Sequence, residues 1–175
     1  VGTAWYVTDA QKCEVLIVAA QTQDGVDLFR VNRQDATVSV APDRIVDLTR
    51  DQAGVTFASS DAAPLTENGQ GANCLNQALP ALLTLTAADI AGAAEWQLQA
   101  TADYAKVRQQ FDRPIGFFQA VKHPIVDMMI AVDETRSLVY QAAAAFDFDP
   151  DDAARCAHLA KSSASDTAEF CANRS

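Results

Sequence analysis

The sequence predicts an α+β protein. A partial antiparallel β-sheet or barrel domain is expected over residues 1–70, followed over residues 71–175 by an incomplete antiparallel α-helical bundle of three long helices. Short apolar runs alternate with turn residues in the first part, whereas apolar residues recur at steps of three and four in the second. Between the two, residues 59–72 are small, polar and turn-forming, which is typical of a connector. We therefore expect the domain boundary near residue 70.

Four segments of the first domain have the pattern of short strands. They are residues 14–20, 26–31, 37–41 and 54–58. Val26 and Leu28 alternate with polar residues, as do Val38 and Val40, which indicates strands with one buried face. Thr22 to Gly25 is the predicted hairpin loop between the first two strands.

One long helix is expected from about Asn73 to Phe111, because apolar residues recur there at helical spacing. Pro80 predicts an irregular stretch near residues 76–80. The helix is expected to stop over residues 112–116. Pro114 disfavours helical geometry at the preceding residue, and Gly116 permits a sharp exit.

The second helix is expected over residues 118–145, with Pro124 weakening its first turns. The third is expected to start at Asp149, which would cap the free amides, with Pro150 in the first helical position. It then runs to Phe170. Small alanine residues along both helices favour close antiparallel packing.

Composition excludes several classes of function. A formal net charge of -10 and a pI near 4.4 argue against nucleic acid and an anionic membrane surface as partners. We expect no run of the roughly 18 to 20 apolar residues that span a bilayer, and the N-terminus lacks the pattern of a signal peptide, so the predicted location is cytoplasmic. The four cysteines form no CxxC pair, which argues against a zinc knuckle or a short disulfide framework.

Other catalytic and metal-binding patterns are weak. His123 and His158 are the only histidines, and no spaced ligands accompany them, so no metal site is predicted. The G-x-S-x-G elbow of a serine hydrolase is missing. The acids at 147–152 lack the glycine and terminal glutamate of a calcium loop, and are interpreted as a loop and helix start.

Residues 91–123 resemble the first two helices of the C-terminal domain of acyl-CoA dehydrogenases. That family commonly reads R-x-Q-F-G-R-P-I-G-x-F-Q-A-V-x-H, and the chain reads Arg-Gln-Gln-Phe-Asp-Arg-Pro-Ile-Gly-Phe-Phe-Gln-Ala-Val-Lys-His from residue 108 to residue 123. Leu159 to Lys161 is similar to the family's third helix, and Val1 to Arg50 resembles the second half of its middle β-domain. The resemblance implies a fragment of such an enzyme.

The resemblance also implies FAD as cofactor. Arg108 takes the place of the arginine that reaches the FAD pyrophosphate of a neighbouring subunit, and a guanidinium suits that bidentate contact. Gln110 would add a hydrogen bond, Phe111 would pack against the adenine, and Gln119 would lie near the same cofactor. The alternative is that Arg108 is a solvated helix residue and Phe111 a core residue.

A second, shorter resemblance lies at the N-terminus. Residues 5–9 are similar to the family's flavin-facing strand, with Tyr6 in the place of the aromatic residue on the isoalloxazine and Thr8 in the place of the hydroxyl near flavin N5. An ordinary edge strand with an exposed aromatic residue is the competing interpretation.

The family removes α and β hydrogens from an acyl-CoA thioester, using a carboxylate base and flavin N5 as hydride acceptor. In most members that base is a glutamate far downstream, at a place beyond Ser175. Some members instead carry it on the first C-terminal helix, at the place of Leu82, and Leu83 stands where an arginine is common. Asp112 replaces the family glycine. No catalytic residue is therefore assigned, and the isolated piece is expected to hold little FAD.

Three hypotheses follow. The chain belongs to an acyl-CoA dehydrogenase that forms a homo-oligomer, either a dimer or a tetramer; or it is a non-catalytic subunit that supplies an FAD interface in a hetero-oligomer; or it is a helical interaction domain.

Overall fold

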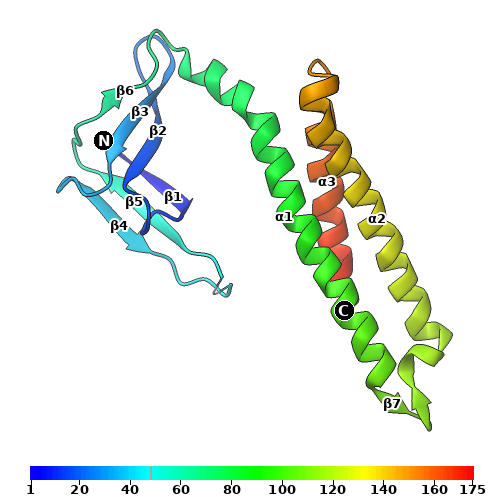
Figure 1. Ribbon diagram of the computed structural model, residues 1–175. Helices are drawn as coiled ribbons and strands as arrows, with labels where there is room; N and C mark the ends of the chain where they lie inside the picture. The colour runs from blue at the N-terminus through cyan, green and yellow to red at the C-terminus, as the bar shows by residue number, and fades with distance from the viewer. Residues whose placement is uncertain (48) are drawn as a thin grey trace. The chain divides into compact units, whose positions relative to one another are not determined.

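The computed structural model describes residues 1–47 and 49–175. They divide into two compact units, Val1–Leu75 and Asn76–Ser175. Antiparallel sheets come first and three long helices follow, so the predicted α+β fold is confirmed (Figure 1). Each unit is considered by itself below.

Within the described residues, the first unit contains two three-stranded antiparallel sheets. One has the order β1 (Gly2–Thr8), β5 (Gln52–Phe57), β4 (Val38–Pro42), and the other the order β2 (Val15–Gln21), β3 (Val26–Asn32), β6 (Ala63–Pro64). Their inner faces form one core, whose buried members are Ala10, Leu16, Val31, Ala53 and Val55. The four strands predicted from alternation lie within two residues of their observed bounds.

Asp27 ties the β2–β3 hairpin to the segment that leads into the first helix. Asp27 is only 4% exposed, and its carboxylate accepts hydrogen bonds from the Thr66 hydroxyl at 2.9 Å and the Gly69 amide at 3.1 Å. Burial would raise the pKa of Asp27, but the hydrogen bonds from Gly69, Thr66 and Thr22 outweigh burial and hold that pKa below its ordinary value. A β-carbon on Gly71 would lie 2.6 Å from the Asp27 Cα, so only glycine fits there.

The helices are α1 (Gly71–Val107), α2 (Gln119–Phe148) and α3 (Ala153–Ala172). Helices α2 and α3 run antiparallel, side by side (Figure 1). Alanines fill the contact near the α2–α3 turn: Ala87, Ala142, Ala145, Ala153, Ala160 and Ala164. Toward the other end of the bundle, Met128 and Val132 pack with Ala94 and Cys171.

A buried hydroxyl cluster lies between α2 and α3. The Thr135 hydroxyl is 2.8 Å from the hydroxyls of both Ser163 and Thr167, and Thr135 is fully buried. Because buried polar groups need partners, a shift of one helix along the other would leave these hydroxyls unsatisfied. The cluster therefore fixes the alignment of α2 against α3.

Two expectations about α1 are wrong. The helix is continuous through Pro80, which removes one backbone hydrogen bond but does not end α1. It ends at Val107 and not at Phe111, since residues 109–114 form a small hairpin.

The predicted start of α3 is also wrong. Asp149 ends α2, donating its amide to the Ala145 carbonyl at 3.0 Å, and Asp152 is the residue before α3. The Asp152 side chain makes no cap hydrogen bond because it is held by Arg155. Helix α2 extends to Phe148, three residues past the predicted end, with Pro124 inside it.

Helix α1 is more apolar than expected. Its length and composition would allow it to cross a bilayer, with a mean hydropathy of 1.2 over an 18-residue window of which 17% is buried. The expectation that no run approaches this limit is therefore wrong.

Candidate functional site

A tight hairpin joins α1 to α2 and carries three of the predicted site residues. Strand β7 (Gln109–Gln110) pairs with β8 (Arg113–Pro114), and the Ile115 amide donates to the Arg108 carbonyl at 2.8 Å. Between the strands, Phe111 and Asp112 have φ of 54° and 60°. Both turn residues are thus left-handed, as in a type I′ turn, which favours glycine or asparagine.

A short 3-10 helix, η1 (Ile115–Phe117), follows the hairpin and packs closely on the end of α1. A β-carbon on Gly116 would lie 3.1 Å from the Ala105 carbonyl oxygen. Contact this close leaves little room for a side chain at position 116. The expected reversal of the chain near Gly116 is confirmed.

The hairpin presents its side chains outward. Arg108 and Gln110 are exposed, and Phe111 is 81% exposed, with its ring edge-on to Phe118 at 5.8 Å between centroids. Among residues 1–47 and 49–175, the Arg108 guanidinium has no ion pair or side-chain hydrogen bond. It is free to bind an anion from outside the chain.

The corner is basic in an acidic protein. Residues 104–123 contain Lys106, Arg108, Arg113 and Lys122 but only one acid, Asp112, whereas the whole chain has a net charge of -10. Arg113 lies over the Phe117 ring at 4.3 Å. Such a local excess of positive charge attracts anionic ligands. Gln119 is exposed at the first position of α2, directly after this corner.

Tyr6 and Thr8 lie on β1, in the other unit. The register between β1 and β5 shifts between Ala4 and Val7, and Tyr6 has a φ of 58°. This bulge re-aims the side chain, and Tyr6 is 74% exposed. Thr8 is exposed as well. An aromatic side chain and a hydroxyl thus lie outward on one strand, and their role stays a prediction.

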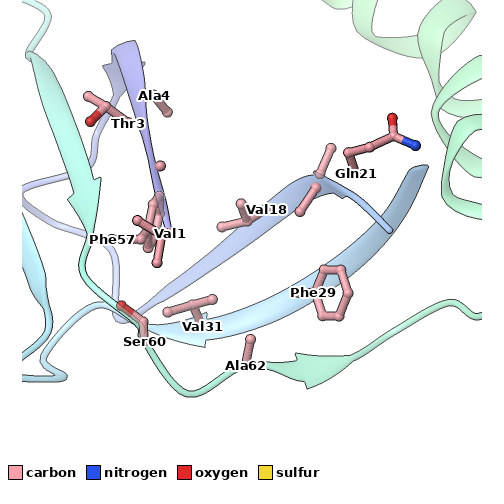
Figure 2. A pocket seen from close by; sticks show the side chains of 13 residues that line it. Val1, Thr3, Ala4, Val18, Gln21, Phe29, Val31, Phe57, Ser60 and Ala62 are labelled. Carbon is pink, nitrogen blue, oxygen red and sulfur yellow. The ribbon is translucent and has the colours of Figure 1, made fainter. Parts of the chain in front are cut away.

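Two features of the fold were not predicted from the sequence. A hollow of about 480 Å³ lies between the two sheets and is lined largely by apolar side chains. Figure 2 shows Val18, Phe29 and Phe57 among them. The hollow contains no titratable side chain. The hollow therefore resembles an uncovered sheet interior more than a reaction site.

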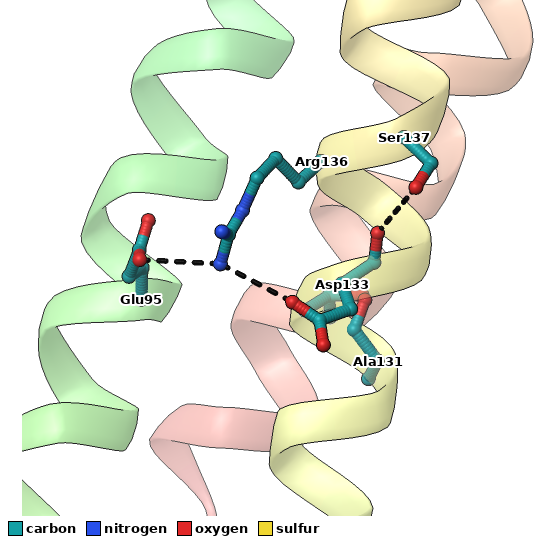
Figure 3. A network of polar contacts seen from close by, with 6 residues as sticks. Glu95, Ala131, Asp133, Arg136 and Ser137 are labelled. Atoms are coloured by element: carbon teal, nitrogen blue, oxygen red, sulfur yellow. Dashed lines mark hydrogen bonds and ion pairs between the residues drawn. The ribbon is translucent and has the colours of Figure 1, made fainter.

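The second feature is an ion-pair network that joins α1 to α2 (Figure 3). Arg136 Nη2 lies 3.1 Å from Glu95 Oε1 and 3.3 Å from Asp133 Oδ1. The three side chains are 43% to 62% exposed, so the network contributes little stability. In the described part of the chain, no group of His, Cys, Asp or Glu side chains has the arrangement of a metal site.

Residues 69–175 match the acyl-CoA dehydrogenase C-terminal domain. The chain belongs to the acyl-CoA dehydrogenase family. This family consists of FAD-dependent flavoproteins. The L-prolyl-[peptidyl-carrier protein] dehydrogenase of Pseudomonas fluorescens is 30% identical over 151 residues, which is 81% of this chain and 40% of that protein.

Solved structures of the family have the same fold. The glutaryl-coenzyme A dehydrogenase in complex with glutaryl-CoA matches with a TM-score of 0.91 and 26% identity, covering 99% of this chain and 46% of that one. The ChsE4–ChsE5 complex of Mycobacterium tuberculosis matches with a TM-score of 0.85 and 30% identity, covering 99% and 46%. The chain thus spans less than half the length of these acyl-CoA dehydrogenase relatives.

Helix α1 carries no carboxylate at the place where some acyl-CoA dehydrogenases have their catalytic base. Leu82 is 55% exposed where some members carry the catalytic base, and Leu83 is half-buried beside it. Asp89 is the first charged residue of α1. The first half of this helix therefore offers apolar contacts and no proton acceptor.

Proposed function

We propose that this chain is part of a flavin-dependent acyl-CoA dehydrogenase and that its corner hairpin binds the pyrophosphate of FAD. The observation that carries the proposal is the unpaired Arg108 guanidinium on a basic, preformed hairpin of a protein with net charge -10. When bound, FAD would accept the hydride released from the β-carbon of an acyl-CoA thioester. These residues fit FAD, because the Arg108 guanidinium can make a bidentate contact with a phosphate and the Phe111 ring can stack on the adenine.

Each predicted residue receives one role in this proposal. Arg108 neutralises phosphate charge, and Gln110 and Gln119 donate or accept hydrogen bonds beside it. Phe111 offers an apolar face, and its 81% exposure leaves that face open for stacking. Tyr6 and Thr8, which belong to the other unit, would serve the ring system of a flavin, with the aromatic side chain packing on it and the hydroxyl donating to it.

A second candidate is a non-catalytic subunit of a heteromeric acyl-CoA dehydrogenase. The uncharged surface of α1 at Leu82 and Leu83 favours it, because this helix offers no carboxylate to take the α-proton. The 30% identity to the ChsE4–ChsE5 complex is consistent with such an assembly. Dye-coupled acyl-CoA oxidation separates the two: the first predicts turnover by the intact protein alone, the second only with a related subunit present.

Replacing Arg108 tests the cofactor site in the intact protein. A charge-assisted hydrogen bond contributes about 1.5 to 3 kcal/mol, so Arg108→Ala should weaken flavin binding roughly 10- to 150-fold. Arg108→Lys should restore it only in part, because ammonium cannot make the bidentate contact. The matched control is Arg155→Ala, which removes an exposed arginine on α3.

Flavin absorbance after gel filtration gives the readout. Unchanged flavin content in Arg108→Ala would refute the proposed cofactor site. An equal loss in Arg155→Ala would show that the effect is not local.

A further inference from the structure

Asn68 and Gly69 form a tight turn in the segment that leads into α1. The Gln70 amide donates to the Glu67 carbonyl at 3.2 Å, and φ is 56° at Asn68 and 74° at Gly69. Both central residues are left-handed, as in a type I′ turn, where asparagine followed by glycine is a favoured pair. The Asn68 side chain is exposed. The backbone geometry of the turn therefore favours this pair of residues.

Packing against the β2–β3 hairpin requires glycine at position 69. A β-carbon on Gly69 would lie 2.3 Å from the Asp24 carbonyl oxygen, and a β-carbon on Gly25 would lie 3.2 Å from the Gly69 Cα. Asn68 is the only asparagine of the sequence that a glycine follows. Because glycine has no side chain, its amide nitrogen reaches the side chain of a preceding asparagine more easily than that of any other residue.

This proximity allows a covalent reaction between the two residues. The Gly69 nitrogen, after losing its proton to water or hydroxide, attacks Cγ of Asn68. A bond forms between that nitrogen and Cγ, the bond from Cγ to Nδ2 breaks, and the amide group leaves as ammonia with a proton from the solvent. Water then opens the cyclic imide at either of its carbonyls. One opening gives aspartate, and the other gives isoaspartate, in which the backbone runs through the former side chain.

A hydrogen bond to Asp27 opposes the first step of this reaction. The Gly69 amide donates to Oδ2 of Asp27 at 3.1 Å, and Asp27 is 4% exposed. The hydroxyls of Thr66 and Thr22 donate to the same carboxylate at 2.9 and 3.2 Å and hold it in place. Removing the proton from the Gly69 amide would set a second negative charge against this carboxylate, which is unfavourable. The amide is therefore unreactive while this bond is made.

We propose that Asn68 is a site of spontaneous deamidation and that the hydrogen bond from Gly69 to Asp27 sets the rate. The reaction proceeds from conformations in which the Gly69 amide has left Asp27. Local openings of this kind occur within a folded protein, and a slow reaction of the open form follows the population of that form. The site lies in the first unit, so it does not depend on the proposed flavin contact of Arg108.

The isoaspartate product would not fit the turn. It adds a methylene to the backbone between position 68 and Gly69, where the Gly69 backbone already lies against Asp24. Gly69 must then move, and its hydrogen bond to Asp27 is weakened. The reaction is therefore expected to loosen the β2–β3 hairpin from the segment that leads into α1.

Peptide mass spectrometry of the chain tests the proposal after incubation at neutral pH, with and without enough urea to unfold it. Replacing the amide NH2 by OH raises the mass of the peptide, whereas cyclisation at Asp24–Gly25 releases water and leaves the mass unchanged after hydrolysis. In urea, Asn68 should gain this mass faster than every other asparagine of the chain. In the native fold the rate at Asn68 should be lower by roughly 10-fold or more, because a hydrogen bond to a charged group must first break.

Three variants separate the Asp27 bond from the rest of the turn. Asp27→Ala removes the acceptor and should raise the native rate at Asn68 by roughly 10-fold or more. The matched control is Thr66→Val, which removes a different donor from the same carboxylate and should change the rate far less. Asn68→Gly keeps a left-handed turn and should show no mass gain at position 68. Far-UV circular dichroism checks that each variant keeps its fold.

Hydrogen exchange of the Gly69 amide, followed by NMR, provides a test in the native chain that needs no variant. Exchange should be slow, although Asn68 beside it is exposed, because Asp27 holds the amide. Fast exchange would overturn the proposal, as would equal rates at Asn68 in the folded and unfolded chain. It is also overturned by a mass gain that comes first at another asparagine, or by a folded Asp27→Ala that reacts at the native rate.

Discussion

Replacing Thr135 with valine measures what the buried hydroxyl cluster contributes to stability. Valine keeps the shape of threonine but removes both 2.8 Å hydrogen bonds, to Ser163 and to Thr167. Each bond contributes about 1 kcal/mol net. Thr167 is 5% exposed and keeps only its 3.4 Å contact to the Ala131 carbonyl, so its hydroxyl is left poorly satisfied. The expected loss is about 2 to 3 kcal/mol, or roughly 4 to 12 °C in Tm for a chain of this length.

Urea denaturation followed by far-UV circular dichroism provides the free energy of unfolding. The matched control is Thr86→Val, which removes an exposed hydroxyl bonded to the Leu82 carbonyl at 2.8 Å within one helix. The control should change stability by less than about 0.5 kcal/mol. If Thr135→Val and Thr86→Val have the same effect, the cluster does not hold α2 against α3 and the reasoning fails.

Four further outcomes are expected. The pKa of Asp27 is lowered in the folded protein, so its carboxylate stabilises the fold fully above about pH 4, and this stabilisation is lost as pH falls through the lowered pKa. Asp27→Asn should therefore reduce the fall in Tm that the native chain shows at acid pH. The same fall in both proteins would contradict this. Met128→Ala should cost about 2 to 5 kcal/mol in urea denaturation because Met128 is fully buried, and a loss under 1 kcal/mol would mean that the site collapses. Gly71→Ala should lower Tm, because the added β-carbon would lie 2.6 Å from the Asp27 Cα. An unchanged Tm would show that the backbone around Asp27 and Gly71 moves apart easily. Burial raises the pKa of Cys156 and Cys171, so mass spectrometry should find them alkylated last at pH 8; early labelling would indicate local opening.

Regular elements were predictable from the sequence because their periodicity is local. The strands around Leu28 and Val40 follow from alternation, and α2 follows from its apolar spacing. The end of α1 was missed because helical spacing continues past Val107, while the turn needs left-handed geometry at Phe111 and Asp112, which their side chains do not signal.

Long-range contacts account for the remaining errors and omissions. Asp27 was not singled out, since its hydrogen-bond donors include Thr66 and Gly69, about forty residues away. The start of α3 was misplaced because the Asp149–Pro150 pattern is a good cap in isolation, and the Asp152–Arg155 pair was not considered. The candidate cofactor residues came from resemblance, and the assignment of Arg108 stays a prediction. A groove of about 400 Å³ that Lys106 and Lys122 line could not be predicted either, because α1, α2 and the segment between them all contribute to it.

The alanine contact between α2 and α3 limits which substitutions the helical unit can accept. Ala142, Ala160 and Ala164 leave space for methyl groups alone, and larger side chains would force the two helices apart at about 1 to 3 kcal/mol per site. Substitutions at these alanines by larger residues are therefore expected to weaken the packing of α2 against α3. A cavity in this domain is more readily made at Met128, where a large buried side chain can be replaced by a smaller one.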